Sequence, residues 1–316
     1  MGSPGEWAGL SAADTLPAYT DPRYVFKPGE DPAAETAAGI GPPPAVVLCD
    51  FDGTISIEDT LDVVIDRAIG VEAREAIDGL YETGDISFRE LISRELSPIE
   101  CSFDAGCEAI AAACAAKAAS AGQPLIGTGV VDPAFPSFCR CCHDAGVPIV
   151  VLSGGMSQLV RHFLADAFAE EPIDAGAGAP TDADLRAGRW LPAGAVPVQA
   201  NTLWVGHEVA ESGSAAAGQW SATFFDGSPS GNDKAAAVAA WKASGTRVVF
   251  IGDGVSDLPV IGAGADLLFA KRGKALERVC AEKGQRCTAF DQFGEVQAGL
   301  QALLHDDETA GVAGRL

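Results

Sequence analysis

The chain alternates between short, almost unbroken apolar runs and longer stretches in which apolar positions recur every three or four residues. An unbroken apolar run is typical of a strand covered on both faces, as in a parallel sheet. The segments 196–205 and 220–225 are weaker strand candidates that could form a hairpin or extend the sheet. Because helical spacing separates the runs, we predict a doubly wound α/β fold. The strong runs are AVVLCD (45–50), VPIVVLS (147–153), TRVVFIGD (246–253) and DLLFAK (266–271).

Residues 57–129 interrupt this rhythm, because their apolar positions follow helical spacing and they contain no strand candidate. We therefore predict a helical cap that is inserted after the first strand and could close over a site as a lid. The apolar stripes that support it are Leu61, Val64, Ile65, Ala68 and Ile69, then Phe88, Leu91, Ile92 and Leu96, then Cys107, Ile110, Ala111 and Cys114.

Composition suggests where the domains begin and end. Residues 1–44 are rich in Pro, Gly, Ala and acidic residues and show no sustained period, so we predict a mobile leader there. We predict a core formed by residues 45–56 and 130–305, the cap over 57–129, and a short frayed tail over 306–316.

The balance of charge limits the possible partners. The 316 residues include 44 acidic and 21 basic side chains, and the formal net charge is −23, which argues against nucleic acid or an anionic membrane. We find no apolar stretch of membrane-spanning length and no secretory signal, so we expect a cytoplasmic protein.

Nine cysteines without zinc-site spacing fit reduced thiols, and Cys139 and Cys142 fall at the helical spacing of core residues. The sequence does not indicate an oligomeric state.

Acidic side chains follow two of the apolar runs where each strand should end. Asp50 and Asp52 lie in DFDGT after the first run, and Asp253 and Asp257 lie in GDGVSD after the third. Ligands of open α/β sheets bind at the carboxyl ends of the strands, so these side chains should converge. Unpaired buried carboxylates are costly, and Mg²⁺ prefers oxygen ligands. The pattern therefore predicts a magnesium site that receives a substrate phosphate.

The residues at these strand ends fit a two-step displacement at phosphorus. Asp50 is placed to attack phosphorus and form an aspartyl-phosphate, which replaces one difficult step by two easier ones. Asp52 can protonate the leaving alcohol and later accept a proton from water. Ser153 and Gly154, in VLSGG, can offer a hydroxyl and helix-terminal N–H groups to the phosphate. Lys234, in GNDKAAA, can pair with both the phosphate and Asp50.

In this order, DFDGT, the serine of VLSGG, the lysine of GNDKAAA and GDGVSD resemble the four motifs of the haloacid dehalogenase superfamily of phosphotransferases. The resemblance extends over roughly residues 45–304 and implies a Rossmann-like core with Mg²⁺ as cofactor. It implies that the Asp50 carboxylate, the Asp52 backbone carbonyl and Asp253 hold the metal. Asp257 would support the metal shell and the lysine.

The helical insertion, with VLSGG, QANTLW and GDGVSDLPV, is similar to the small cap of the phosphoserine phosphatase-like branch. The segments DGTISIEDT and DLLFAKRGKALERVC are also similar to methylthioribose-salvage enolphosphate phosphatases and to related fungal and plant phosphatases. Asp59 stands where phosphoserine phosphatases bind the substrate ammonium with a glutamate, and Arg94 is near the position of their carboxylate-binding arginine. Ser256 replaces the usual asparagine, and these departures argue against phosphoserine itself. The substrate-binding candidates in the cap are Asp59, Phe88, Arg89 and Arg94.

The function we predict is a Mg²⁺-dependent phosphatase that hydrolyses a small soluble phosphate monoester through an aspartyl-phosphate. Two other functions remain open at this point. One is a phosphotransferase or diphosphate-processing enzyme on the same fold, and the other is a non-catalytic binding protein. The intact motif residues argue against the second, because a decayed site would have lost at least one of them.

Overall fold

The computed structural model describes residues 43, 45–122, 124–170, 196, 198–205 and 219–313, with the side chains of 169–170 and 305–313 left out. The leader predicted over 1–44 therefore lies outside the described residues, apart from Pro43. None of the helices in the described part of the chain has both the length and the apolar character needed to cross a membrane.

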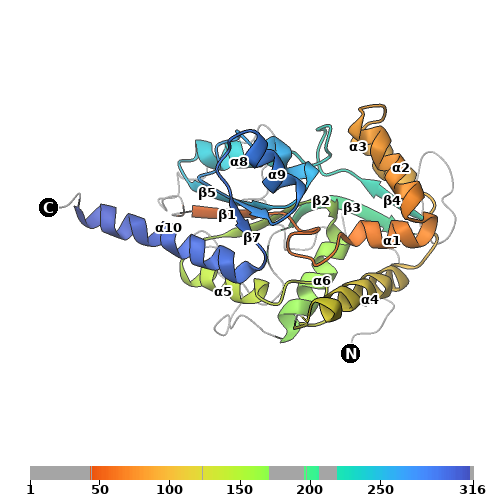
Figure 1. Ribbon diagram of the computed structural model, residues 1–316, viewed down its shortest axis with the longest axis horizontal. Helices are drawn as coiled ribbons and strands as arrows, with labels where there is room; N and C mark the ends of the chain where they lie inside the picture. Colours follow the sequence, from red (N-terminus) through yellow and green to blue (C-terminus); the bar gives the residue numbers. More distant parts are fainter. Residues whose placement is uncertain are drawn as a thin grey trace.

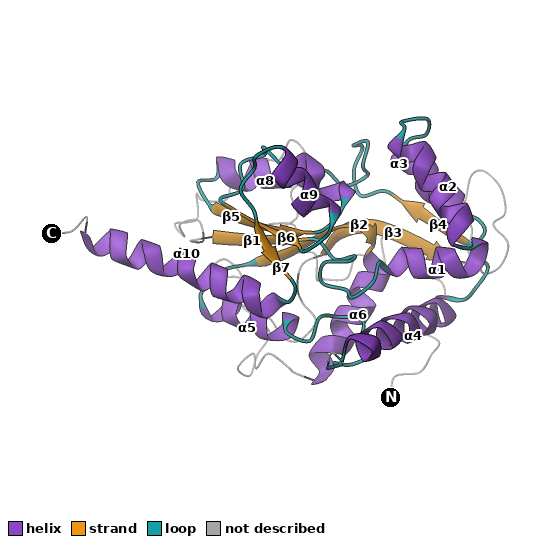
Figure 2. Cartoon of the chain, viewed as in Figure 1, coloured by secondary structure: helices purple, strands orange, loops and turns teal. Residues whose placement is uncertain are grey.

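Seven strands of the described residues form one sheet in the order β4-β3-β2-β1-β5-β6-β7 (Figure 2). Neighbouring strands are parallel except β3 and β4, which are antiparallel and extend the sheet beyond β2, where the sequence left a hairpin or an extension open. The doubly wound α/β prediction is confirmed. The strands are β1 (Ala45–Cys49), β2 (Ile149–Met156), β3 (Val198–Val205), β4 (Trp220–Thr223), β5 (Arg247–Gly252), β6 (Leu267–Lys271) and β7 (Thr288–Phe290).

Helices cover both faces of this sheet, which explains the unbroken apolar runs (Figure 1). The side chains of β1 alternate between two separate buried clusters, with Val46 and Leu48 in one and Val47 and Cys49 in the other. A strand buried on both sides gains from an apolar residue at every position. One face carries α8 (Lys234–Ala243) and α9 (Ala275–Glu282), and the other carries α5 (Phe135–Asp144), α6 (Ser157–Glu170) and α10 (Phe293–Ala313).

Of the five described helices between β1 and β2, the first four lie within residues 57–129, where the sequence predicts a cap inserted after the first strand (Figure 1). Ser87 and Ser102 cap the third and fourth of them through their hydroxyls, which satisfy backbone N–H groups that the helix leaves unpaired. The second helix has no buried residue, which explains why the sequence shows no apolar stripe for it. The helices are α1 (Thr60–Ile69), α2 (Val71–Glu82), α3 (Phe88–Leu96) and α4 (Phe103–Ala121).

Some features of the fold differ from the sequence predictions. Strand β2 does not end at Ser153 but continues to Met156, with an irregular register against β3 between Leu152 and Met156. Helix α10 runs through most of the segment predicted as a tail. The exact domain boundaries remain a prediction. Cys139 and Cys142 are buried free thiols in α5, as expected for core residues.

Candidate active site

The turn after β1 brings two carboxylates to the edge of the sheet. The backbone N–H of Asp50 still donates to the carbonyl of Ile251 on β5 at 2.8 Å, whereas the chain then turns sharply around the carbonyl of Phe51. Gly53 has a φ of 71° at this turn, and a Cβ there would collide with the Asp253 carboxylate. Glycine is therefore needed both for the left-handed backbone and for the approach of the two loops.

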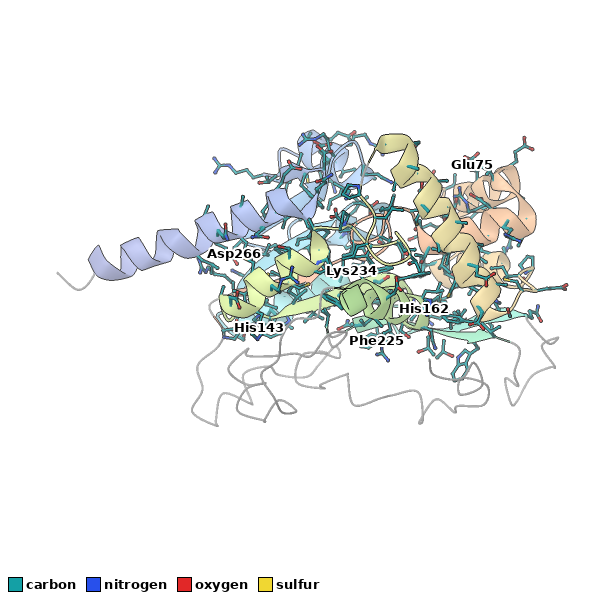
Figure 3. All side chains as sticks on the ribbon, turned by 90° about the horizontal axis from the view of Figure 1, so that it is seen from below. Glu75, His143, His162, Phe225, Lys234 and Asp266 are labelled. Atoms are coloured by element: carbon teal, nitrogen blue, oxygen red, sulfur yellow. The ribbon has the colours of Figure 1, made fainter. Side chains whose placement is uncertain are left out.

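Lys234 forms the centre of the site. Its Nζ donates to Oδ1 of Asp50 and Oδ1 of Asp257, both at 2.6 Å, and to the hydroxyl of Ser256 at 3.1 Å. Asp50 and Lys234 are each 3% exposed, and Asp257 is fully buried. Figure 3 shows Lys234 inside the molecule, whereas Glu75 and His143 lie at its periphery. Three motifs that are far apart in the sequence thus meet at one ammonium group.

Burial and charge determine the protonation of this centre. Burial lowers the pKa of Lys234, but the carboxylates of Asp257 and Asp50 outweigh that effect and raise it above its usual value, so the lysine stays charged. Burial raises the pKa of Asp50, and Asp257 adds to this rise while Lys234 opposes it. Burial, followed by the charge of Asp257, raises the pKa of Asp253 to about 6. The site therefore holds more negative charge than its lysine neutralises.

The carboxylates fit a divalent cation. Oxygens of Asp50, Asp253 and Asp257 all lie within 4.8 Å of one another. Asp257 is already engaged, because its Oδ2 accepts the N–H groups of Asp253 at 2.9 Å and Gly254 at 3.1 Å. Asp253 is only weakly engaged: the Thr54 hydroxyl is 3.4 Å away and Lys274 Nζ is 3.7 Å away. Hard oxygen donors with excess negative charge suit Mg²⁺, with Asp257 in the supporting position.

Asp52 lies beside this centre and contacts the start of the cap. Its Oδ1 accepts from the N–H and hydroxyl of Thr60 at 3.0 and 2.6 Å, and its Oδ2 accepts from the Ser153 hydroxyl at 3.1 Å. A Cβ at Gly155 would collide with the Asp52 carboxylate. Asp52 is thus held at the boundary between core and cap, where a leaving group could receive its proton.

Ser153 and Gly154 belong to the irregular end of β2 rather than to a helix start, because α6 begins only at Ser157. Ser153 Oγ accepts from the Gly155 N–H at 2.8 Å, which fixes the hydroxyl beside Asp52. The helix N-terminus that the sequence placed at Ser153 therefore lies four residues later, at Ser157. The role of the Ser153 hydroxyl in binding phosphate remains a prediction.

Two predicted substrate-binding residues have other partners in the structure. The Asp59 carboxylate caps α1 by accepting from the N–H groups of Leu61 and Asp62 at 3.0 and 3.1 Å. Arg94 is exposed on α3 and pairs with Glu90 at 2.6 Å. The structure brings Asp59 near Asp52, which contributes to its raised pKa after the larger effect of burial. It does not bring Arg94 to the motif residues.

Several residues that position the site were missed from the sequence. Thr60 holds Asp52, as described above. Asn232 is buried and donates to the carbonyls of Ser153 and Gln199, both at 2.9 Å. Asn201, which the sequence analysis did not place in the site, donates to the carbonyl of Gly154 at 2.7 Å. A polar residue within a predicted buried strand, such as Asn201, was the available signal, because it needs a partner.

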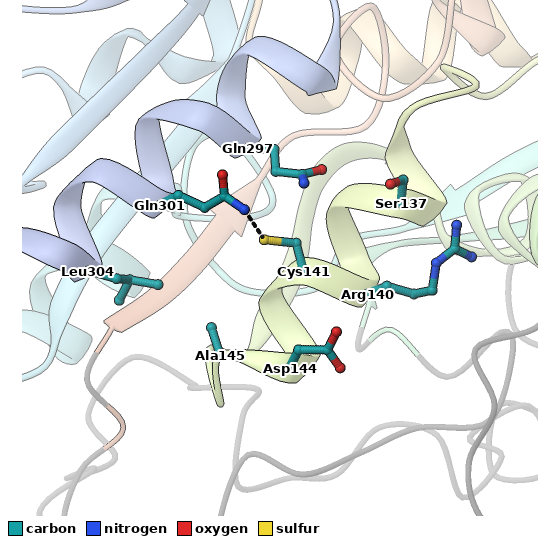
Figure 4. Close-up of a pocket in the computed structure, with 8 residues that line it drawn as sticks. All are labelled: Ser137, Arg140, Cys141, Asp144, Ala145, Gln297, Gln301 and Leu304. Carbon is teal, nitrogen blue, oxygen red and sulfur yellow. Dashed lines mark hydrogen bonds between the residues drawn. The ribbon is translucent and has the colours of Figure 1, made fainter.

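A groove between α5 and α10 lies apart from these residues (Figure 4). None of the motif residues contributes to its lining, so it is not the candidate active site. Its lining residues are Ser137, Arg140, Cys141, Asp144, Ala145, Gln297, Gln301 and Leu304.

Comparisons with known proteins find similarity to hydrolases and phosphatases. Residues 47–196 match the family model of haloacid dehalogenase-like hydrolases. Polyol phosphate phosphatase PYP1 of Saccharomyces cerevisiae is 27% identical over 278 residues, covering 84% of this chain and 96% of that protein. Pdp3-interacting factor 1 of Schizosaccharomyces pombe is 24% identical over 263 residues, covering 82% of this chain and 95% of that protein.

A solved substrate-bound phosphoserine phosphatase complex is 17% identical, with a TM-score of 0.45, and the alignment covers 80% of this chain and 96% of that one. The family match includes Asp50, Asp52 and Ser153, and Lys234 from beyond its end pairs with the first of them. The part of the chain that contains Asp50, Asp52 and Ser153 is therefore similar to haloacid dehalogenase-like hydrolases.

Proposed function

We propose that this protein is a Mg²⁺-dependent phosphatase that hydrolyses small phosphate monoesters through an aspartyl-phosphate on Asp50. The observation that carries the proposal is the buried pairing of Lys234 with Asp50 and Asp257, with Asp253 alongside. Lys234, at 2.6 Å, opposes the rise in the pKa of Asp50 that burial causes, and so favours the ionised form that can act as a nucleophile.

In the first step, an oxygen of Asp50 forms a bond to phosphorus while the bond from phosphorus to the ester oxygen breaks. Asp52 donates its proton to the departing alkoxide, so the alcohol leaves neutral. The location of Asp52 beside Ser153 and the first turn of the cap supports this role. Lys234 and the Ser153 hydroxyl would interact with phosphoryl oxygens and balance their charge.

In the second step, water attacks phosphorus and the bond from phosphorus to Asp50 breaks. Asp52, now a carboxylate, accepts the proton of the attacking water and is ready for another cycle. Inorganic phosphate leaves and the Asp50 carboxylate is restored. When bound by the carboxylates of Asp50 and Asp253 and the backbone carbonyl of Asp52, Mg²⁺ would supply the positive charge that reduces repulsion between an anionic nucleophile and an anionic ester.

The substrate class we propose is the phosphate ester of a polyol, on the basis of the relation to the yeast polyol phosphate phosphatase. The placement of the cap residues is consistent with an uncharged leaving group. Arg94, the candidate for binding a substrate carboxylate, points to solvent and pairs with Glu90. Asp59 is used as a helix cap.

The test is release of inorganic phosphate from glycerol 3-phosphate, longer sugar-alcohol phosphates and phosphoserine, with Mg²⁺ or with EDTA. We expect Mg²⁺-dependent turnover that favours the polyol phosphates. Asp50→Asn should lower kcat by three or more orders of magnitude, on the order of the loss when other covalent nucleophiles are removed, while circular dichroism stays unchanged.

The matched control is Asp291→Asn, because Asp291 is an exposed aspartate that pairs with Arg272. This variant should retain full turnover. Wild-type activity in Asp50→Asn would exclude the covalent mechanism, and equal activity in EDTA would exclude the metal.

A further inference from the structure

The loop of residues 224–233, here called the β4–α8 loop, contacts the cap on one side. Arg89, on cap helix α3, donates from Nη2 to the carbonyls of Asp226 at 2.5 Å and Ser228 at 3.2 Å. The centre of its guanidinium lies 4.3 Å from the centroid of the Phe224 ring. One arginine thus makes two hydrogen bonds and one stacking contact to a single loop of the core.

Phe224 fits tightly between the cap and its own loop. Its ring meets that of Phe88 on α3 edge to face, with centroids 6.2 Å apart. On the other side, a Cβ at Gly231 would collide with the ring of Phe224, so the loop closes against it. The ring therefore links the cap to the turn that precedes α8.

The opposite side of the β4–α8 loop contacts the phosphate-binding residues. Asn201 accepts the N–H of Phe225 at 3.0 Å and donates to the carbonyl of Gly154 at 2.7 Å. Asn232, near the end of the loop, donates to the carbonyl of Ser153 at 2.9 Å. Both asparagines are buried, so the loss of one of these hydrogen bonds would be costly.

Within the loop, one carboxylate connects the two sides. Asp226 accepts the N–H of Ser228 at 2.8 Å and the N–H of Asp233 at 2.9 Å. Asp233 is the N-cap of α8 and immediately precedes Lys234. Arg89 therefore binds carbonyls of the same turn in which the Asp226 carboxylate holds the start of α8. Helix α8 begins with Lys234.

We propose that Arg89 is a positioning residue that fastens the cap to the β4–α8 loop and thereby holds Ser153, Gly154 and Lys234 in the arrangement that receives the phosphoryl group. The inference rests on the phosphatase function proposed above and deepens it. Sequence resemblance made Arg89 a candidate for contact with substrate. Its guanidinium is instead occupied by backbone carbonyls and an aromatic ring.

This role has a distinct kinetic signature. Without Arg89, the β4–α8 loop has the arrangement that binds substrate in a smaller fraction of the molecules. The apparent affinity for substrate falls in proportion to that fraction. Saturating substrate restores the arrangement, because it binds the competent form preferentially. Loss of the Arg89 contacts therefore raises KM and leaves kcat nearly unchanged, whereas partial unfolding would lower kcat at constant KM.

The experiment compares Arg89→Ala, Arg89→Lys and the wild-type full chain, with p-nitrophenyl phosphate as the probe. We expect KM to rise by about tenfold in Arg89→Ala, with kcat within about twofold. Arg89→Lys should recover part of the loss, since an ammonium can donate to a carbonyl but lacks the planar face that stacks on Phe224. The control is Arg67→Ala, because Arg67 is an exposed arginine on cap helix α1.

Amide hydrogen exchange provides a second readout that needs no activity. Exchange of peptides covering 224–233 should accelerate several-fold in Arg89→Ala and not in Arg67→Ala. Unchanged KM with unchanged exchange would overturn the proposal, and so would a fall in kcat at constant KM. If wild-type protein released no phosphate, the phosphatase function would fail, whereas the exchange data would still decide whether Arg89 holds the loop.

Discussion

The centre of the candidate site and the cap each contain a buried carboxyl group near a cation that pairs with two carboxylates, but they deal with the negative charge differently. At the centre, Lys234 bonds two carboxylates at 2.6 Å. In the cap, Arg74 bonds Asp66 at 2.7 Å and Asp78 at 2.8 Å. Beside these residues, Glu95 is only 4% exposed, and burial, followed by the charge of Asp78, raises its pKa to about 8.

The two regions therefore respond to excess negative charge in different ways. The mechanism proposed for the centre requires an ionised nucleophile, and the centre combines a fixed lysine with a set of oxygens suited to a metal. The cap has no such requirement, and Glu95 stays neutral near pH 7 by keeping its proton. A buried acid that can hold a proton is less costly than one that must be charged.

Removal of the lysine should have the largest effect. In Lys234→Met, Asp50 and Asp257 lose the buried lysine that pairs with both, so we expect activity to vanish and the free energy of unfolding to fall by about 3–5 kcal/mol. Urea denaturation measures the loss, and added Mg²⁺ should recover part of it by binding the folded state.

The control for this comparison is Lys242→Met, because Lys242 is a partly exposed lysine that pairs with Asp266 at 2.7 Å. Partly exposed pairs contribute less, and we expect a loss below about 1 kcal/mol. Equal losses in the two variants would contradict the view that the centre depends on its buried charge.

Gly155→Ala should have an intermediate effect that is confined to chemistry. The added methyl group would displace the Asp52 carboxylate from Ser153, since a Cβ cannot fit beside it. Gly155 does not have a positive φ, so the alanine backbone itself is not strained. We expect kcat to fall by about a hundredfold, the usual scale for a misplaced general acid, with little change in stability.

Gly79→Ala provides the matched control, because a Cβ at this position of α2 meets no atom within 4 Å. It should leave kcat unchanged and could raise stability slightly, as alanine favours a helix. Full activity in Gly155→Ala would mean that Asp52 need not occupy its observed position.

Apolar runs predicted the central strands, because strands buried on both faces leave an unmistakable pattern in the sequence. The same reasoning missed β7, which has only three residues. It also ended β2 too early, since Ser153, Gly154 and Gly155 read as a turn. Whether such residues continue a strand depends on the neighbouring β3, which pairs Asn201 with Met156.

The motif residues were predicted because strand ends in this type of sheet converge on one edge. The cap residues were harder, because helical spacing specifies a face but not what that face meets. Arg94 follows Glu90 by four residues, and this spacing already favoured a local ion pair. Glu95 lies within the stripe of Leu91, Ile92 and Leu96, yet its burial and its protonation state depend on α2 and on Asp78.

Glu95→Gln should have almost no effect near pH 4.5 and should appear only as a dependence on pH. The folded protein keeps the Glu95 proton up to about pH 8, whereas the unfolded chain releases it near the ordinary value of 4.5. Between these values the folded state binds one more proton, so stability falls as pH rises, by at most about 1.4 kcal/mol per pH unit. Stability from this group is complete below pH 4.5 and lost by pH 8.

Glutamine cannot ionise, so the variant should gain stability relative to wild type as the pH is raised from 5 to 8, as measured by urea denaturation at each pH. The comparison with wild type cancels the contributions of Asp62 and Asp253, whose pKa values burial also raises, each to about 6. Glu282→Gln, on an exposed residue of α9, should give a constant difference. If the Glu95 curve also stays parallel to wild type, the acid is ionised in the folded cap, and cap and centre tolerate buried charge by the same means.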